Sequence, residues 1–218
     1  TYRSHEHHLN VLNGEIGQEF KDALLKAKNL KVFAFFPRGP RYMTSNKPIR
    51  SVEDVKGLKL RVPPVPVYIE AWKSLGANVT PIDYSELYMA LKQGVVEGQE
   101  NPLATIDALK LSSVQKYLIE TKHHLLAFTM SMDNDRFQKL TPTQQKAIEE
   151  AANEAADLEY QLMLENEDAL KAKLQEEGME LIQIADIAAF RDPVVKRLPE
   201  VFKDKWAPNL WDRIQAVE

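Results

Sequence analysis

Short apolar runs alternate with helical patterns along most of the chain. Apolar positions recur at helical spacing over residues 10–28, and an aromatic, β-branched run follows at residues 31–36. A second apolar run, at residues 58–62, ends at Pro63. Strands that are apolar on both faces are typical of a sheet covered by helices. The alternation of the two patterns therefore predicts an α/β fold.

Several shorter elements follow from local signals. Gly76 and Gly94 are suited to end helices, because glycine adopts the left-handed conformation at a helix C-terminus. Asp83 and Glu86 have the spacing of a capping box, which predicts a helix start. The sequence predicts further strands at residues 78–81, 124–132 and 179–184, and a short strand that runs into a polar turn over residues 95–102. It also predicts helices at residues 67–75 and 102–111.

A single long helix is predicted in the second half of the chain. Thr141 can cap its start, Pro142 suits its first turn, and Gly178 is its expected end. At 1.5 Å per residue this helix is about 54 Å long, which is too long for one small domain. Its apolar positions are too irregular for a coiled coil. We therefore expect it to cross the back of two lobes.

Composition narrows the classes of function. The chain has 218 residues, of which 44% are hydrophobic and 28% charged, as in ordinary globular proteins. A net charge of −4 gives no basic surface for nucleic acid. The sequence contains no cysteine, so disulfides and cysteine-based zinc sites are excluded. No apolar run approaches the roughly 20 residues that span a bilayer.

An arginine within an apolar strand is the main candidate for a binding residue. Arg61 lies in the run that ends at Pro63, and its guanidinium cannot lose its charge at physiological pH. A buried charge of this kind requires an anionic partner, and that partner is a protein carboxylate or a ligand. Arg41, twenty residues upstream, starts another strand-like segment. Two arginines on neighbouring strands can bind one carboxylate together.

Other polar residues suit a binding site better than a catalytic one. Asn101 falls where a strand ends and Tyr84 just before a helix start, the places where open α/β sheets bind ligands. His123 lines a strand end or a cleft. The histidines of residues 5–8 lack the spacing of a zinc site, and we expect them to face solvent. We find no phosphate loop, nucleophile motif or acid/base pair, so an enzyme of unknown class is disfavoured.

Four sequence motifs resemble a known family. They are SVEDVKGLKLRVP at residues 51–63, LGANVTP at 75–81, YSELYMAL at 84–91 and GQENP at 98–102. In order and spacing they resemble the substrate-binding proteins of tripartite ATP-independent periplasmic (TRAP) transporters, of the DctP type. The resemblance covers essentially the whole chain. Pro64 stands where sialic-acid binders of this family carry asparagine, which argues against sialic acid as the ligand.

The resemblance implies a periplasmic two-lobe receptor that captures an organic acid and delivers it to a membrane permease. It implies that Arg61 pairs with the ligand carboxylate, that Arg41, Asn101, Tyr84 and His123 also line the site, and that several further contacts come from the part of the first lobe without a counterpart here. The first lobe comprises residues 1–38 and 127–166, and the second comprises residues 39–126 and 167–218. No catalytic residue, metal or cofactor is implied, and the receptor does not itself span the membrane.

Two questions stay open at this point. The ligand is a uronate, another sugar acid, a keto acid or a dicarboxylate. Roughly the first third of the family's length has no counterpart here, so the first lobe is expected to be incomplete. The alternative is therefore a fragment that does not bind ligand, or an assembly in which an open sheet edge pairs with another chain.

Overall fold

The computed structural model describes residues 2–218, which group into two compact units. Unit 1 contains the residues up to Gly39, together with His124–Asn166 and Leu210–Glu218; unit 2 contains Pro40–His123 and Glu167–Asn209. Each unit combines helices with a sheet, which confirms the predicted α/β class. Residues 210–218 group with unit 1, whereas we placed them with the second lobe. The assignment of the units to lobes stays a proposal.

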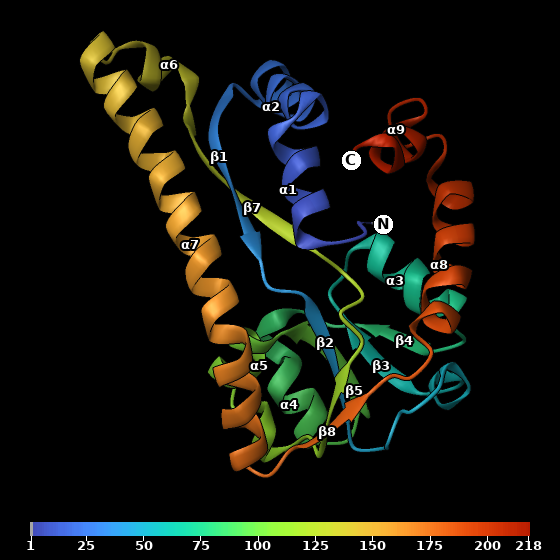
Figure 1. Ribbon diagram of the computed structural model, residues 1–218. Coiled ribbons are helices and arrows are strands. Elements are labelled where there is room, and N and C mark those ends of the chain that lie inside the picture. Colours follow the sequence, from blue (N-terminus) through green and yellow to red (C-terminus); the bar gives the residue numbers. More distant parts are fainter. Residues whose placement is uncertain (1) are drawn as a thin grey trace. The chain divides into compact units, whose positions relative to one another are not determined.

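Unit 1 is built around two antiparallel strands. These are β1 (Leu30–Arg38) and β7 (Leu126–Asp133), which lie side by side in Figure 1. β1 is mostly buried because its aromatic side chains pack on helices, and Phe33 contacts Phe137 with 5.2 Å between ring centroids. β7 is much more exposed, with 60% of Phe128 and 41% of Met130 accessible. The helices of this unit are α1 (His5–Asn13), α2 (Glu15–Lys28), α6 (Asn134–Gln138) and α9 (Leu210–Ala216).

The first predicted helix is in fact two. The pattern over residues 10–28 indicated one helix, but the backbone at Gly14 is extended (φ −91°, ψ −161°) and separates α1 from α2. The expectation that the nearby histidines face solvent is wrong for His7 and His8, which are 3% and 2% exposed. Nε2 of His7 lies 2.8 Å from the carbonyl oxygen of Ile214, and the ring of His8 packs 4.3 Å from that of Tyr2.

The long helix is confirmed. α7 (Pro142–Glu176) contains 35 residues and is continuous through Asn166 and Glu167, where the chain passes from unit 1 to unit 2 (Figure 1). Gly178 follows it with a positive φ of 101°, as expected for a glycine that ends a helix. No helix in the described part of the chain combines the length and the apolar character needed to cross a membrane.

Unit 2 contains a six-stranded mixed sheet with the order β4-β3-β5-β2-β6-β8. Its strands are β2 (Arg41–Ser45), β3 (Lys59–Val62), β4 (Asn78–Pro81), β5 (Gly98–Pro102), β6 (Tyr117–Glu120) and β8 (Glu180–Gln183). β3 runs parallel to β4 and β5, and β2 runs antiparallel to β5. The two arginine-bearing strands β2 and β3 therefore flank β5, all of whose residues are buried.

Helices and short turns surround this sheet. The helices are α3 (Pro66–Ser74), α4 (Leu87–Lys92), α5 (Leu103–Ala108) and α8 (Ile187–Phe202). One apolar core, which includes Tyr42, Leu91 and Leu118, forms within the unit. The predicted capping box at Asp83 and Glu86 does not form: Asp83 makes no capping hydrogen bond, and a single 3-10 turn (Tyr84–Glu86) precedes α4. The α-helix starts three residues later than a cap at Asp83 requires, at Leu87, and this displacement removes the geometry of a capping box.

Candidate functional site

Arg61 is a buried cation whose hydrogen-bonding capacity is mostly unused. Its strand is buried because Leu60 and Val62 on either side are fully enclosed, and Arg61 itself is 2% exposed. Nε of Arg61 donates a 2.8 Å hydrogen bond to the carbonyl oxygen of Ile82. Within residues 2–218 neither Nη1 nor Nη2 has a hydrogen-bond acceptor, and no carboxylate lies within ion-pair distance. The N–H groups of Nη1 and Nη2 can therefore donate to an external acceptor.

The electrostatic surroundings of Arg61 also favour an external anion as its partner. Burial lowers the pKa of Arg61, the charge of Glu100 raises it, and the charge of Arg41 lowers it again. The first effect is the largest, because a cation loses favourable hydration when it is buried. The guanidinium nevertheless stays charged at neutral pH, because the pKa of arginine is so high. An anion placed beside it would gain a strong electrostatic interaction.

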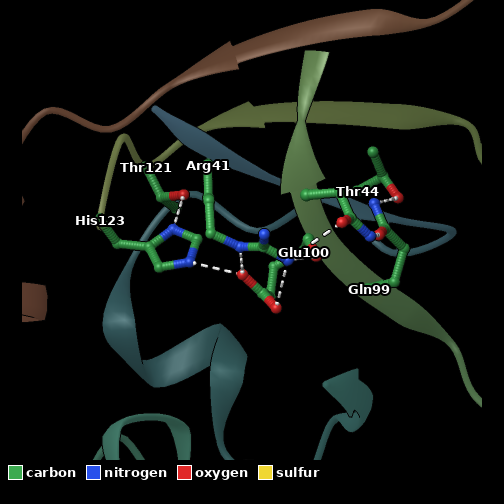
Figure 2. A network of polar contacts seen from close by, with 7 residues as sticks. Arg41, Thr44, Gln99, Glu100, Thr121 and His123 are labelled. Atoms are coloured by element: carbon green, nitrogen blue, oxygen red, sulfur yellow. Dashed lines mark hydrogen bonds and ion pairs between the residues drawn. The ribbon is translucent and has the colours of Figure 1, made fainter. Parts of the chain in front are cut away.

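Arg41, in contrast, has a protein partner. Its Nε donates to Oε2 of Glu100, and its Nη2 donates to Oε1 of the same carboxylate at 3.0 Å (Figure 2). This bidentate geometry is the strongest form of arginine–carboxylate pair. Glu100 is completely buried and Arg41 is 4% exposed. Burial raises the pKa of Glu100, but the hydrogen bond from His123 and the charge of Arg41 lower it, and the net direction is downward.

His123 completes the same cluster. Its Nε2 lies 3.1 Å from Oε2 of Glu100, and its Nδ1 lies 2.8 Å from Oγ1 of Thr121 (Figure 2). The ring also packs edge-on against Trp72, with 4.9 Å between centroids. The structure therefore brings Arg41 and His123 together on one carboxylate, Glu100.

Asn101 is joined to Arg41 and to the neighbouring residue on its own strand face. Its Oδ1 accepts a 3.0 Å hydrogen bond from Nη2 of Arg41, and its Nδ2 donates to Oε1 of Gln99 at 2.5 Å. Gln99 is the residue of β5 that pairs in register with Arg61 on β3. Asn101 is thus positioned between the two arginine strands.

Tyr84 is the most exposed of the predicted site residues. It starts the 3-10 turn that follows β4 and is 53% exposed. It lies two residues after Ile82, whose carbonyl oxygen holds Arg61. Its ring is therefore available as an aromatic surface near the strand ends.

Charge balance indicates what this site can bind. Of its three buried ionic groups, Arg41 and Glu100 form an ion pair, whereas among the described residues Arg61 has no carboxylate within 4 Å, although the charges of Glu100 and Asp83 act on it from further away. The remaining charge of one positive unit suits a single carboxylate, which can accept two parallel N–H bonds from a guanidinium. In the described part of the chain, no group of three or more histidine and carboxylate side chains could hold a metal ion. The site therefore has the charge and the donor geometry to accept one carboxylate, within a mixed α/β fold.

The chain belongs to the DctP family, described as bacterial extracellular solute-binding protein, family 7, whose model matches residues 1–205. A solute-binding protein of Roseobacter denitrificans is 37% identical over 203 residues, which cover 92% of this chain and 62% of the relative. The 2,3-diketo-L-gulonate-binding periplasmic protein of Escherichia coli is 31% identical over 218 residues, which cover 100% of this chain and 66% of the relative. The chain thus spans slightly less than two thirds of the length of these relatives.

Solved structures confirm the fold as that of two-lobe TRAP solute-binding proteins. One from Pseudomonas putida F1, with bound D-glucuronate, superposes with a TM-score of 0.89 at 33% identity and covers 100% of this chain and 70% of its own. One from Roseobacter denitrificans, with bound L-galactonate, has a TM-score of 0.86 at 33% identity, with coverage of 99% and 70%. The resemblance seen in the four motifs is therefore correct.

Sequence reasoning missed the residues that hold the predicted ones in place. Glu100 belongs to the GQENP motif, but the motif does not reveal that it pairs with Arg41. No role was predicted for Thr44, Gln99 or Gln115. All four are buried polar residues. The signal for Glu100 was present, since a carboxylate in a buried strand requires a cation for the same reason that Arg61 requires an anion.

Proposed function

We propose that the protein is a periplasmic receptor that binds an organic acid through its carboxylate and delivers it to the membrane subunits of a TRAP transporter. The observation that carries the proposal is Arg61, a buried guanidinium whose two Nη groups find no acceptor among the residues that the structure describes. We assign the ligand carboxylate to these two groups. Each charge-assisted hydrogen bond contributes about 1.5–3 kcal/mol.

The other predicted residues have supporting roles in this proposal. Arg41 is held by Glu100 through Nε and Nη2, so its remaining Nη1 is the group that faces a ligand oxygen. Asn101 adds an amide N–H, Tyr84 an aromatic surface, and His123 a ring at the edge of the site. Because Glu100 neutralises Arg41, the site as a whole selects a monoanion over a neutral molecule.

Sugar acids are the favoured ligand class. The related structures hold D-glucuronate, L-galactonate, β-D-galacturonate and D-erythronate, each of which carries one carboxylate and several hydroxyl groups. These ligands belong to those proteins, and they support the class rather than one compound for this chain. No feature of the site supports catalysis, and we propose a receptor rather than an enzyme.

Calorimetric titration of the natural full-length protein tests this function. D-Glucuronate, D-galacturonate, L-galactonate and D-erythronate should include at least one ligand of micromolar affinity or tighter, whereas glucose and galactose should not bind. The neutral sugars are matched controls, because they keep the ring and hydroxyls of the uronates and lack the carboxylate. Equal binding of a uronate and its neutral sugar would refute the carboxylate assignment.

Self-association is a second candidate, and the exposure of β7 favours it. This strand carries Phe128 and Met130 on its surface, and its one partner strand among the described residues is β1. An unpaired strand edge with exposed apolar side chains promotes pairing with another chain. Sedimentation of the 218-residue chain tests whether this pairing occurs. A monomer at micromolar concentration excludes edge pairing, and a dimer that Met130→Lys dissociates supports it.

A further inference from the structure

A line of buried polar side chains leads from the main chain near β6 to Asn101. At its far end, Nε2 of Gln115 donates to the carbonyl oxygens of Val114 at 3.2 Å and Glu97 at 3.4 Å. Oε1 of Gln115 accepts a 2.8 Å hydrogen bond from the hydroxyl of Thr44. A carbonyl oxygen can only accept, so the NH₂ group of Gln115 must face these carbonyls and its oxygen must face Thr44.

The line continues in the same direction up to Arg41. Oγ1 of Thr44 accepts from Nε2 of Gln99 at 3.0 Å, and Oε1 of Gln99 accepts from Nδ2 of Asn101 at 2.5 Å. Figure 2 shows Thr44 and Gln99 joined beside the Arg41–Glu100 pair. Oδ1 of Asn101 then accepts from Nη2 of Arg41. A guanidinium can only donate, so this end also permits one orientation.

We propose that Gln115, Thr44 and Gln99 are positioning residues that fix the orientation of the Asn101 amide, so that Asn101 presents an N–H donor to the ligand. Nδ2 of Asn101 carries two hydrogens, and Gln99 is the one acceptor that the described residues provide for them. The second hydrogen is free for a ligand oxygen. The site then selects an acceptor, such as a carboxylate or hydroxyl oxygen, at this position and rejects an ammonium or amide donor.

The orientation is determined because a reversed amide fits neither neighbour. A reversed Asn101 would place its NH₂ against the donor Arg41 and its oxygen against the acceptor Oε1 of Gln99. Thr44, Gln99 and Gln115 are 0%, 0% and 2% exposed, so water is not at hand to relieve such contacts. Hydrogen bonds that run in one direction also polarise and strengthen one another. Arg41 therefore acts on the Asn101 amide directly, and the carbonyls of Glu97 and Val114 act on it through Gln115, Thr44 and Gln99.

A matched pair of substitutions at Thr44 tests this proposal, which rests on the proposed function for its binding readout. Thr44→Val keeps the shape of the side chain and removes the hydroxyl, whereas Thr44→Ser keeps the hydroxyl and removes a methyl group. The first readout is the side-chain amide signal of Asn101 in ¹⁵N-edited NMR spectra of the ligand-free protein. The second is the affinity of the natural full-length protein for D-glucuronate or the tightest acid of the panel.

We expect Thr44→Val to shift the Asn101 amide signals, to accelerate their exchange with water, and to weaken acid binding about tenfold. Thr44→Ser should keep the Asn101 amide signals close to those of the natural protein, and it should bind the acid with an affinity within about twofold. Where Thr44→Val does not fold, Gln115→Met serves as the second variant, because it also interrupts the line with little change in volume.

Two results would overturn the inference: Asn101 signals unchanged in the valine variant, or equal losses of affinity in the valine and serine variants. A natural protein that binds no sugar acid would refute the proposed function instead. The NMR comparison of the valine and serine variants needs no ligand, and it still decides whether the line of side chains orients Asn101.

Discussion

The carboxylate of Glu100 meets the guanidinium of Arg41 edge-on, with Oε1 3.0 Å from Nη2 and Oε2 bonded to Nε. The two residues lie 59 positions apart in the sequence and share a completely enclosed environment. Their charges cancel, whereas Arg61 has no carboxylate within 4 Å among the described residues. The two arginines of the site therefore differ in their protein partners, and we propose that Arg61 makes the main contact with the ligand carboxylate.

Loss of the Glu100 charge should destabilise the protein severely. In Glu100→Gln the guanidinium of Arg41 stays buried without a counter-ion, and breaking a buried pair in this way costs about 3–5 kcal/mol. Urea unfolding measures the change. Glu53→Gln is the control, because Glu53 pairs with Lys56 on the surface, where side chains are 68% and 60% exposed and such pairs contribute about 0–1 kcal/mol. Equal effects in the two variants would contradict a buried ion pair.

Tyr42 should stabilise the protein more at neutral than at acidic pH. Its hydroxyl donates a 2.5 Å hydrogen bond to Oε1 of Glu167. Burial raises the pKa of Glu167, but this hydrogen bond and the charge of Lys122 lower it, and the net direction is downward. A carboxylate with a lowered native pKa stabilises the fold above its unfolded pKa and loses that contribution as pH falls through the native value.

We therefore expect Tyr42→Phe to cost about 1.5–3 kcal/mol at pH 7, the contribution of a hydrogen bond to a charged group, and clearly less at pH 3. Unfolding by urea at both pH values measures the two costs. Tyr88→Phe is the control, because the hydroxyl of Tyr88 bonds to Ser113 at the surface, at 3.2 Å. A cost for Tyr42→Phe that is the same at both pH values would show that Glu167 is not the acceptor.

Acid should destabilise the protein through His8. Burial, together with the smaller effects of the charges of His5 and His7, lowers the pKa of this imidazole to about 4. The unfolded state binds the proton near pH 6.5 and the native state near pH 4, so native stability falls as pH decreases between these values. The full loss, reached below pH 4, is on the order of 3 kcal/mol.

His8→Phe removes the titrating group and keeps a ring against Tyr2. The stability of this variant relative to the natural chain should therefore improve by about 2–3 kcal/mol between pH 7 and pH 4.5. Guanidinium unfolding at several pH values gives this difference directly, because the contributions of the carboxylates cancel. A difference that does not change with pH would mean that His8 is accessible to protons in the native state.

Gly98 should not tolerate a side chain, because it permits close contact between β5 and β2. A Cβ atom at this position would lie 2.6 Å from the main-chain oxygen of Thr44. Gly98→Ala should cost about 1–3 kcal/mol through strain in the sheet. Gly39→Ala is the control, since its nearest contact is a flexible atom of Met163 at 3.7 Å. Thermal unfolding of both variants checks this, and a harmless Gly98→Ala would contradict the register of β5 and β2.

Local signals predicted most elements of the fold, but not strand β6 (Tyr117–Glu120). Arg61 lies on a buried strand, as the apolar run before Pro63 predicted, and the long helix starts and ends where Thr141, Pro142 and Gly178 predicted. These features depend on a few neighbouring residues. One helix was predicted wrongly: the pattern over residues 10–28 indicated a single helix, whereas the extended backbone at Gly14 divides it in two.

The partners within the site could not be predicted in the same way. Arg41 meets Glu100 because β2 and β5 pair antiparallel with Met43 opposite Glu100, a register that depends on the whole sheet. The orientation of Asn101 depends on Gln115, which is distant in sequence from both arginines. The binding roles of Arg61, Arg41, Asn101, Tyr84 and His123 stay predictions that ligand titrations must test.

The central claim is that Arg61 binds the ligand carboxylate with both of its Nη groups, and Arg61→Lys tests it most directly. Lysine keeps the charge but loses the planar pair of donors. Calorimetry of the natural full-length protein with its tightest sugar acid should show an affinity about 10- to 100-fold lower in the variant, which corresponds to the loss of one charge-assisted hydrogen bond. An affinity within twofold of the natural protein would contradict the claim.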